Sequence, residues 1–232
     1  MGNRKRMIAG HEDHADRRFP RQKYWCFFVG VLLAMVFQSI GCKPAIRDDL
    51  DYSYGVVQTI NHEYLDGAIV QFEGVLWNPG EHDKLEKMIA EDSIAQGRRV
   101  LQLDAETGLL SILCAFSGAK SVVALNRHDA AVANSRYNAA LLDLESVLKV
   151  PEKAFTSTEL FRGLGEEEKF DLILMDLRRG ESIERQIDSL FEGLPSHLAP
   201  GGRCLLTCGS QACLSRLEER ASTEQRKTKP LT

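Results

Sequence analysis

The sequence predicts an α/β fold in which a mostly parallel sheet is covered by helices on both faces. Short apolar segments of strand length recur along the chain, and segments with helical spacing separate them. The clearest of these strands, residues 99–103, runs through a glycine-containing turn directly into an apolar helix at 109–116. Because parallel strands need long crossover connections, helices placed in this way cover the sheet.

The elements before this central strand form an additional layer. Residues 43–68 show no sustained hydrophobic period, so we expect a linker that leads into a short helix. Residues 69–77 have strand composition, and Asn78-Pro79-Gly80 ends them with turn residues. Residues 83–95 place apolar side chains near one helical face, and Gly97 follows as a helix stop.

Strands and helices continue to alternate after residue 116. We expect a second core strand at 120–125, a helix at 130–142 with Asp129 as its N-cap, a third strand whose place the pattern leaves open, a fourth at 170–176, a helix over 183–194, a turn at 198–203 and a fifth strand at 204–207. Residues 211–221 have the composition of a last helix, and residues 222–232 form a polar tail. The fifth strand is then left with an open edge, which invites pairing with a protein partner or a second copy of the chain.

The N-terminal residues 1–42 have the pattern of a targeting segment. A basic stretch precedes an unbroken apolar run over 24–37, which is shorter than the roughly 20 residues of a spanning helix and fits the ~7–15 of a signal-peptide core. Ser39-Ile40-Gly41-Cys42 looks like a bacterial lipobox, which predicts lipid modification of Cys42. An uncleaved anchor over 24–41 and an incidental start of the chain are the alternatives. The first two interpretations place the rest of the chain at a membrane, outside the cytoplasm.

Charge and cysteine content exclude several classes of function. The net charge is −4 although the N-terminal segment is basic, so the body is strongly acidic, and we expect no nucleic-acid partner. The six cysteines form no Cys-x-x-Cys pair and have no metal-ligand spacing with histidine, so we expect no metal site. The histidines have no nearby nucleophile in the sequence, and none is assigned a catalytic role.

Residues 99–112 carry a family resemblance. They resemble the first motif of the class I S-adenosylmethionine-dependent methyltransferases, whose usual form is Val-Leu-Asp-Leu-Gly-Cys-Gly-Thr-Gly-Leu-Leu-Ser-Ile. The matching positions are Val100, Leu101, Leu103, Thr107, Gly108, Leu109, Leu110, Ser111 and Ile112. Residues 158–161 look like the Gly-Asp-Leu-Phe ending of the family's third strand, which places that strand there. The resemblance extends over about 70–210 and implies a Rossmann-like domain at 69–221 that lacks the family's usual last two strands.

The positions that would bind S-adenosylmethionine are altered. Asp104 and Glu106 stand where the family has glycines, whereas Gly108 is kept. Asn126 replaces the acid that takes the ribose hydroxyls, and Glu159 corresponds to the adenine-side acid. Together these changes remove roughly 3–6 kcal/mol of binding free energy, a loss of about a hundred- to ten-thousand-fold in affinity.

The candidate catalytic position is Asp176, at the end of the fourth strand. Relatives that methylate amino groups continue there with prolines and an aromatic ring, but here Leu177, Arg178 and Arg179 follow, so only the first acceptor remains. The resemblance therefore leaves two functions open. The domain is either a binding module with weakened or lost cofactor binding, or an active methyltransferase of unknown substrate.

Lipid attachment at Cys42 can be tested directly. Metabolic labelling with a fatty-acid analogue should mark the wild-type chain and should not mark Cys42→Ala, because the thiol is the attachment atom. Cys26→Ala is the matched control and should retain the label. Equal labelling of wild type and Cys42→Ala would contradict the lipobox interpretation.

Overall fold

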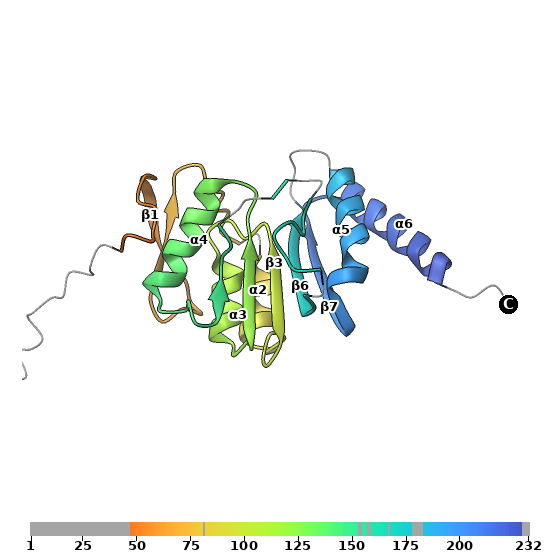
Figure 1. Cartoon of the computed structure of the whole chain (residues 1–232), viewed down its shortest axis with the longest axis horizontal. Coiled ribbons are helices and arrows are strands. Elements are labelled where there is room, and N and C mark those ends of the chain that lie inside the picture. Colours follow the sequence, from red (N-terminus) through yellow and green to blue (C-terminus); the bar gives the residue numbers. More distant parts are fainter. Residues whose placement is uncertain are drawn as a thin grey trace, which may run out of the picture. The chain divides into compact units, whose positions relative to one another are not determined.

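A five-stranded parallel sheet lies at the centre of the computed structural model (Figure 1), in the order β5-β4-β3-β6-β7. The structure describes residues 47–80, 82–152, 155–156, 159–166, 168–177 and 183–228. The elements in chain order are β1 Val56–Asn61, β2 Ala68–Phe72, α2 Asp83–Ala90, β3 Arg99–Leu103, α3 Leu109–Phe116, β4 Ser121–Leu125, α4 Asp129–Leu141, β5 Leu148–Lys149, β6 Phe170–Leu177, α5 Ile183–His197, β7 Leu198–Cys208 and α6 Gln211–Thr228. The chain divides into the units Met1–Arg47 and Asp48–Thr232, and all of these elements belong to the second.

The strand β3 is the middle of the sheet. Leu101 pairs with Val123 of β4 on one side and with Ile173 of β6 on the other, parallel in both cases. Chain order reverses on the two sides of β3, which makes its carboxyl end the topological switch point where open α/β sheets bind ligands. The predicted Rossmann-like α/β fold is confirmed.

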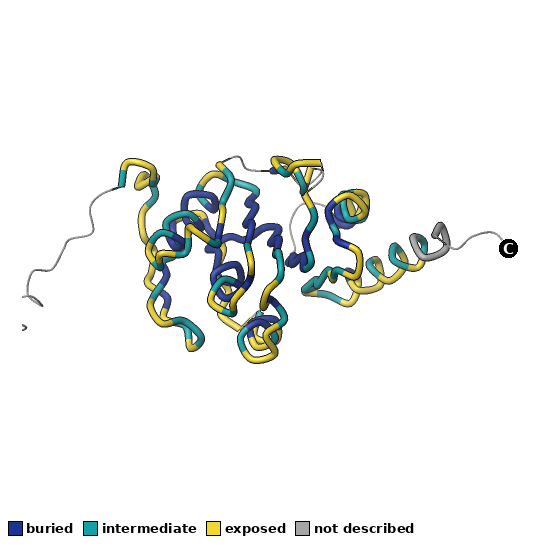
Figure 2. The backbone as a smooth tube through the Cα atoms, turned by 60° about the horizontal axis from the view of Figure 1, so that its bottom comes forward, coloured by how far each residue is buried: buried dark blue, intermediate teal, exposed yellow. Residues whose placement is uncertain are grey.

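Helices cover both faces of the sheet. Alternate side chains of β3 point to opposite faces, so Val100 packs with α2 and α3 whereas Leu101 and Leu103 pack with α5 and α6. These side chains are fully buried, and the buried part of the chain is concentrated in the central strands (Figure 2). Burial on both faces explains why the strand sequences are continuously apolar rather than alternating.

The third strand was predicted in the wrong place. The strand beside β4 is β5, Leu148–Lys149, whereas Glu159–Phe161 lies in a turn. Pro151 follows β5 closely and cannot donate to a ladder, so the strand is too short to give a periodic signal. The apolar side chains of Leu160 and Phe161 pack under α5, and this packing produced the strand-like pattern.

The region before the core contains a hairpin instead of a linker and a short helix. The strand β1 pairs antiparallel with β2, and its side chains are exposed except for Ile60. An exposed strand without alternation gives no hydrophobic period, and only its partner shows it to be a strand. The strand expected over 69–77 ends at Phe72, and the helix expected over 83–95 ends at Ala90.

The last strand starts earlier than predicted. Leu198 pairs with Phe170, and Arg203 pairs with Leu172, so the expected turn at 198–203 is a bulge within β7. A disulfide joins Cys208, at the end of β7, to Cys213 on α6. The helix α6 continues to Thr228, beyond the predicted end at 221, and in the described part of the chain no strand follows β7.

The targeting segment and Cys42 lie outside the described residues. Across the residues that are described, no helix combines the length and apolar character needed to cross a membrane.

The central position of β3 can be tested with Leu103→Asp. The substitution places a charge without a partner in a fully buried position, which should cost several kcal/mol and unfold a domain of ordinary stability. Leu214→Asp, at an exposed position on α6, is the control and should melt close to wild type. A Leu103→Asp domain that melts within a degree or two of wild type would contradict this placement.

Candidate functional site

The loop after β3 keeps a backbone that glycine normally provides. Asp104 has φ +60°, Glu106 +53° and Gly108 +84°, all in the left-handed region. A β-carbon in this region costs roughly 1–2 kcal/mol per residue. Two residues with side chains thus hold left-handed backbone in this loop, and other contacts must compensate for the strain.

Asp104 is compensated by an ion pair. Its buried carboxylate Oδ2 lies 2.5 Å from an Nη2 atom of Arg127, which follows the neighbouring strand β4. An ionised carboxylate is retained in the interior only when it is paired in this way.

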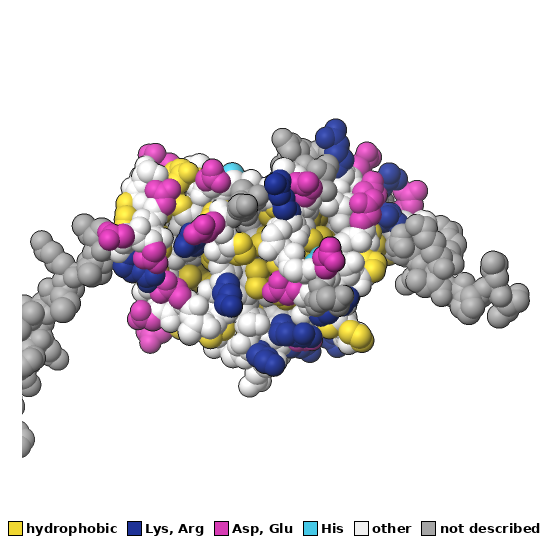
Figure 3. Space-filling model, in the orientation of Figure 1, with side chains coloured by type: hydrophobic (Ala, Val, Ile, Leu, Met, Phe, Trp, Pro, Cys, Tyr) yellow, Lys and Arg dark blue, Asp and Glu magenta, His cyan; other side chains and the backbone are white. Residues whose placement is uncertain are grey.

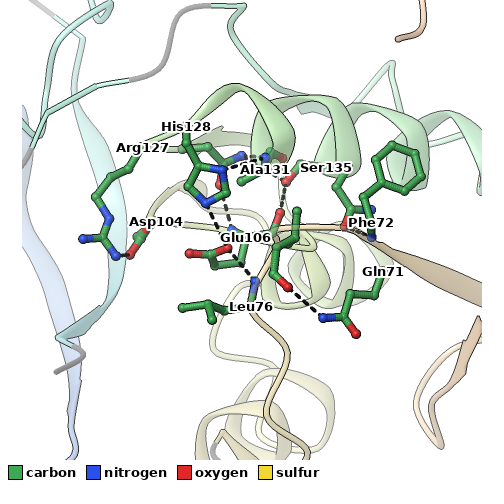
Figure 4. Close-up of polar contacts among 12 residues, drawn as sticks. Gln71, Phe72, Leu76, Asp104, Glu106, Arg127, His128, Ala131 and Ser135 are labelled. Carbon is green, nitrogen blue, oxygen red and sulfur yellow. Dashed lines mark hydrogen bonds and ion pairs between the residues drawn. The ribbon is translucent and has the colours of Figure 1, made fainter. Parts of the chain in front are cut away.

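Glu106 holds three segments together. Its buried Oε2 accepts a hydrogen bond from the backbone N–H of Leu76 (3.1 Å) and lies 3.6 Å from Nε2 of His128 (Figure 4). The neighbouring Glu106 carboxylate raises the pKa of His128 above its ordinary value, because it stabilises the imidazolium. The segment after β2, the loop after β3 and the residues after β4 thus meet at one carboxylate.

Asn126, at the position expected to bind ribose, forms its hydrogen bonds within the protein interior. Its Oδ1 accepts the N–H of Glu106 (2.7 Å), and its Nδ2 donates to the carbonyl of Ala131 and to Oγ of Ser135. Ser135 in turn donates to the carbonyl of Glu106 (2.7 Å). With 1% of its surface exposed, Asn126 holds the loop against α4 and does not face solvent.

Gly108 is required by the same contact with α4. A β-carbon there would lie 3.3 Å from Oγ of Ser135, in addition to the strain of its positive φ. The helix α4 begins with His128 as its N-cap, whose side chain accepts the N–H of Ala131. The predicted cap, Asp129, is the first residue of the helix.

Two asparagines of α4 attach the hairpin to the loop, and sequence reasoning missed both roles. Asn138 accepts the N–H of Val70 and donates to the carbonyls of Val70 and Thr107, while Asn134 accepts the N–H of Phe72. The available signal was their spacing of four residues in an otherwise alanine-rich helix, which puts both amides on one face.

A second polar group lies at the end of β6. Oδ1 of Asp176 accepts a hydrogen bond from Oγ1 of Thr207 (2.5 Å), and Oδ2 lies 3.8 Å from Nε2 of His82. Two histidines to which no catalytic role was assigned, His82 and His128, lie on two sides of the site. The sequence showed neither, because each contacts a residue distant in the chain.

Two hollows flank Glu106. A cavity of about 500 Å³ is lined by Gly74, Leu76, Glu106, Arg127, His128, Phe155 and Thr156. A pocket of about 20 Å³, room for one water molecule, is lined by Leu76, Trp77, Asn78, His82, Gln102, Asp104, Ala105, Glu106, Thr107, Leu109, Leu110 and Asp176. Leu76 and Glu106 line both, so the hydrogen bond between them separates the two hollows. We call the two hollows together the cleft, with the cavity as its wide half and the pocket as its narrow half.

Glu159 does not join the other predicted residues. It is exposed, and its Oε2 accepts hydrogen bonds from Arg162 and Thr156. Of this group only Thr156 lines the larger cavity. In the described part of the chain, no group of His, Cys, Asp or Glu side chains could hold a metal ion.

Comparisons with known proteins agree with this geometry. No protein-family model matches the chain. A protein N-terminal and lysine N-methyltransferase of Candida albicans is 31% identical over 150 residues, which cover 57% of this chain and 55% of the relative. The chain thus spans about half the length of the curated relative that it matches.

Solved structures share the arrangement of the sheet. A ribosomal protein L11 methylase from Lactobacillus delbrueckii matches with a TM-score of 0.55 and 21% identity, covering 72% of this chain and 88% of the other. The domain shares the fold of this methylase. A 16S rRNA N2 G1207 methyltransferase from T. thermophilus has the same fold, with a TM-score of 0.54 and 20% identity, over 70% of this chain and 45% of the other.

The residues at the loop do not fit the cofactor that this fold family implies. In class I methyltransferases the glycines let the backbone approach the methionyl part of S-adenosylmethionine, whose carboxylate is negative. Here the buried carboxylates of Asp104 and Glu106 occupy the loop, and the pocket beside them has room for about one water molecule. The larger cavity, of about 500 Å³, is within the size range of small-molecule sites.

The contact between Glu106 and His128 predicts a pH dependence. Glu106→Gln should lower the pKa of His128, measured by NMR titration, because the neutral amide no longer stabilises the imidazolium. A raised histidine pKa adds stability that is fully present below the ordinary value of 6.5 and is lost as pH rises through the raised value. The stability difference between wild type and variant should shrink over that window.

Glu152→Gln is the control for this titration, because Glu152 pairs with Arg136 on the exposed side of α4. It should leave the titration of His128 unchanged. The same His128 titration in wild type and Glu106→Gln would show that the two side chains do not interact in solution.

Proposed function

We propose that this chain is an exported, membrane-tethered protein whose methyltransferase-like domain has weakened or lost its binding of S-adenosylmethionine and acts as a binding module. The observation that carries the proposal is the buried Glu106 carboxylate. It is placed where the family has a glycine, and it is held there by Leu76 and His128. The protein's own carboxylate thus takes the backbone N–H of Leu76 and closes the narrow half of the cleft.

Energetics support weak binding. The cofactor's carboxylate would meet two buried carboxylates, of which Asp104 is already paired with Arg127 and Glu106 already contacts His128. Binding would have to displace those pairs, and an uncompensated buried charge costs several kcal/mol. Asn126 is committed to the loop and to α4, so the position that binds ribose in the family supplies no side chain to a ligand.

Two observations support export. The basic and apolar pattern of residues 1–42 ends in the lipobox-like Cys42. The disulfide between Cys208 and Cys213 is typical of proteins that reside in oxidising compartments outside the cytoplasm. Export would also separate the domain from the cytoplasmic supply of S-adenosylmethionine. We further propose that the partner of this module is a protein or a second copy pairing along the open edge of β7, and not a nucleic acid.

An active methyltransferase is the alternative function, and two observations favour it. The Candida albicans relative is named for methylation of protein N-termini and lysines, and the larger cavity has the size of a ligand site. The discriminating measurement is transfer of a radiolabelled methyl group from S-adenosylmethionine to peptides with free amino groups, using the purified full chain. Turnover in the unmodified protein would establish the alternative.

The proposal of weakened binding is tested by restoring the glycines. We expect the purified full chain to show at most millimolar affinity for S-adenosylmethionine by calorimetry. The double variant Asp104→Gly, Glu106→Gly should gain at least about a hundredfold, roughly 3 kcal/mol, because it removes two negative charges and leaves Arg127 and His128 to face the ligand's carboxylate.

Asp143→Gly is the matched control. Asp143 also has a positive φ, of +54°, but it is exposed and lines neither hollow of the site. It should melt at or slightly above the wild-type temperature and leave binding unchanged. Micromolar binding by the wild-type chain would contradict the proposal, and so would a folded double variant that binds no better.

A further inference from the structure

An aromatic patch covers the outer side of the hairpin and the adjoining part of α4. Tyr52, Tyr54, Phe72 and Tyr137 form a continuous series of ring contacts, with centroid distances of 6.0 Å (Tyr52–Tyr137), 5.3 Å (Phe72–Tyr137) and 6.3 Å (Tyr54–Phe72). Val56 pairs with Phe72 across the two strands, so the two side chains share a face of the hairpin. These five residues are the aromatic patch.

The patch is exposed at its rim. Its innermost member, Phe72, is buried, and Tyr54 and Tyr137 are half-buried, but Tyr52 is 48% and Val56 54% exposed, and the neighbouring Val57 is 58% exposed. The elements that carry it, β1 and α4, lie together at the end of the domain opposite α6 (Figure 1). The site residues do not account for these exposed side chains, because Asn134 and Asn138 of α4 hold β2 by its backbone from the inner side.

The position of the patch along the chain indicates what covers it. Only residues 43–51 separate Cys42 from Tyr52, and nine residues span at most roughly 30 Å when fully extended. A compact domain of this size is about 40 Å across. A tether at Cys42, or an anchor that ends at Gly41, would therefore keep Tyr52 within roughly 30 Å of the bilayer, which is less than the width of the domain.

The chemistry of the patch fits a lipid surface. Tyrosine joins an apolar ring to a polar tip, which is why it collects where one end of a side chain is in hydrocarbon and the other in water. Acidic side chains lie over the same end of the domain (Figure 3), and the segment before Tyr52 carries the acids Asp48, Asp49 and Asp51 against the bases Lys43 and Arg47. With this small excess of negative charge the patch gains no attraction from an anionic surface, which favours a zwitterionic one.

We propose that the aromatic patch docks onto the headgroup layer of the membrane to which the chain is tethered, with zwitterionic lipid as its partner. This inference rests on the proposed membrane tether. Docking buries the outer face of the hairpin, and it holds the domain in one orientation with its ligand cleft on the inner side of α4.

Hydroxyl-radical footprinting of the full chain, expressed in a bacterial host and reconstituted in phosphatidylcholine vesicles, tests this inference. Phe116, which is 44% exposed at the end of α3, is the matched internal control for Tyr52. The measured quantity is the oxidation rate of Tyr52 or Val56 divided by that of Phe116. This ratio should be several-fold lower in the vesicles than in a lipid-free chain kept soluble by a polymer. Val56→Asp should remove this protection, whereas Leu214→Asp, at an exposed position on α6, should not.

Flotation of the vesicles separates failure of the tether from failure of the patch. A chain that does not float with the lipid overturns the tether and, with it, the docking. A chain that floats while Tyr52 reacts in proportion to Phe116 overturns the docking alone. Protection that accompanies cross-linking between the aromatic patches of two copies, rather than between their β7 edges, identifies a second copy as the occupant and also overturns the proposal.

Discussion

Two buried carboxylates in a backbone conformation suited to glycine determine how the rest of this site is built. Asp104 and Glu106 keep the loop shape of the fold, yet each brings strain and a negative charge into the interior. Both can remain only because Arg127 and His128, which follow the next strand, lie within ion-pair distance. The loop after β3 and the residues after β4 therefore depend on each other, because the buried carboxylates of the loop need the side chains that follow β4.

The same network fixes the surroundings of the cleft. The N–H of Leu76 binds Glu106, while Asn134 and Asn138 bind the backbone of β2, so the hairpin is held to the sheet by side chains of the loop and of α4. This arrangement leaves a cavity of about 500 Å³ on one side of Glu106 and room for about one water molecule on the other. Sharing a fold with methyltransferases therefore does not imply sharing their ligand, because a fold carries many chemistries and the site residues decide among them.

The hairpin contributes to both of the surfaces discussed here. Its inner side meets α4 and the loop through backbone hydrogen bonds, and its outer side carries the aromatic patch. Because the hairpin is held on one side and exposed on the other, it borders both the ligand cleft and the aromatic patch. The helix α4 is the shared support, since Ser135 faces the loop and Tyr137 faces the patch.

The sequence by itself determined the central α/β architecture, because β3, α3, β4 and β6 have strong and uninterrupted apolar patterns set by burial on both faces. It also determined which site positions differ from the family, and Asp176 lies near the end of β6 whereas Gly108 is the N-cap of α3. The tertiary structure decided the features that depend on contacts between segments far apart in the sequence. The exposed β1 and the two-residue β5 are strands only through their partners, and His82, His128 and Asn138 act through residues far away in the chain. Contacts of this kind leave no periodic pattern in the sequence. Only the folded chain therefore shows that Asp104 and Glu106 lie beside Arg127 and His128, and that the side chain of Asn126 is turned toward the interior.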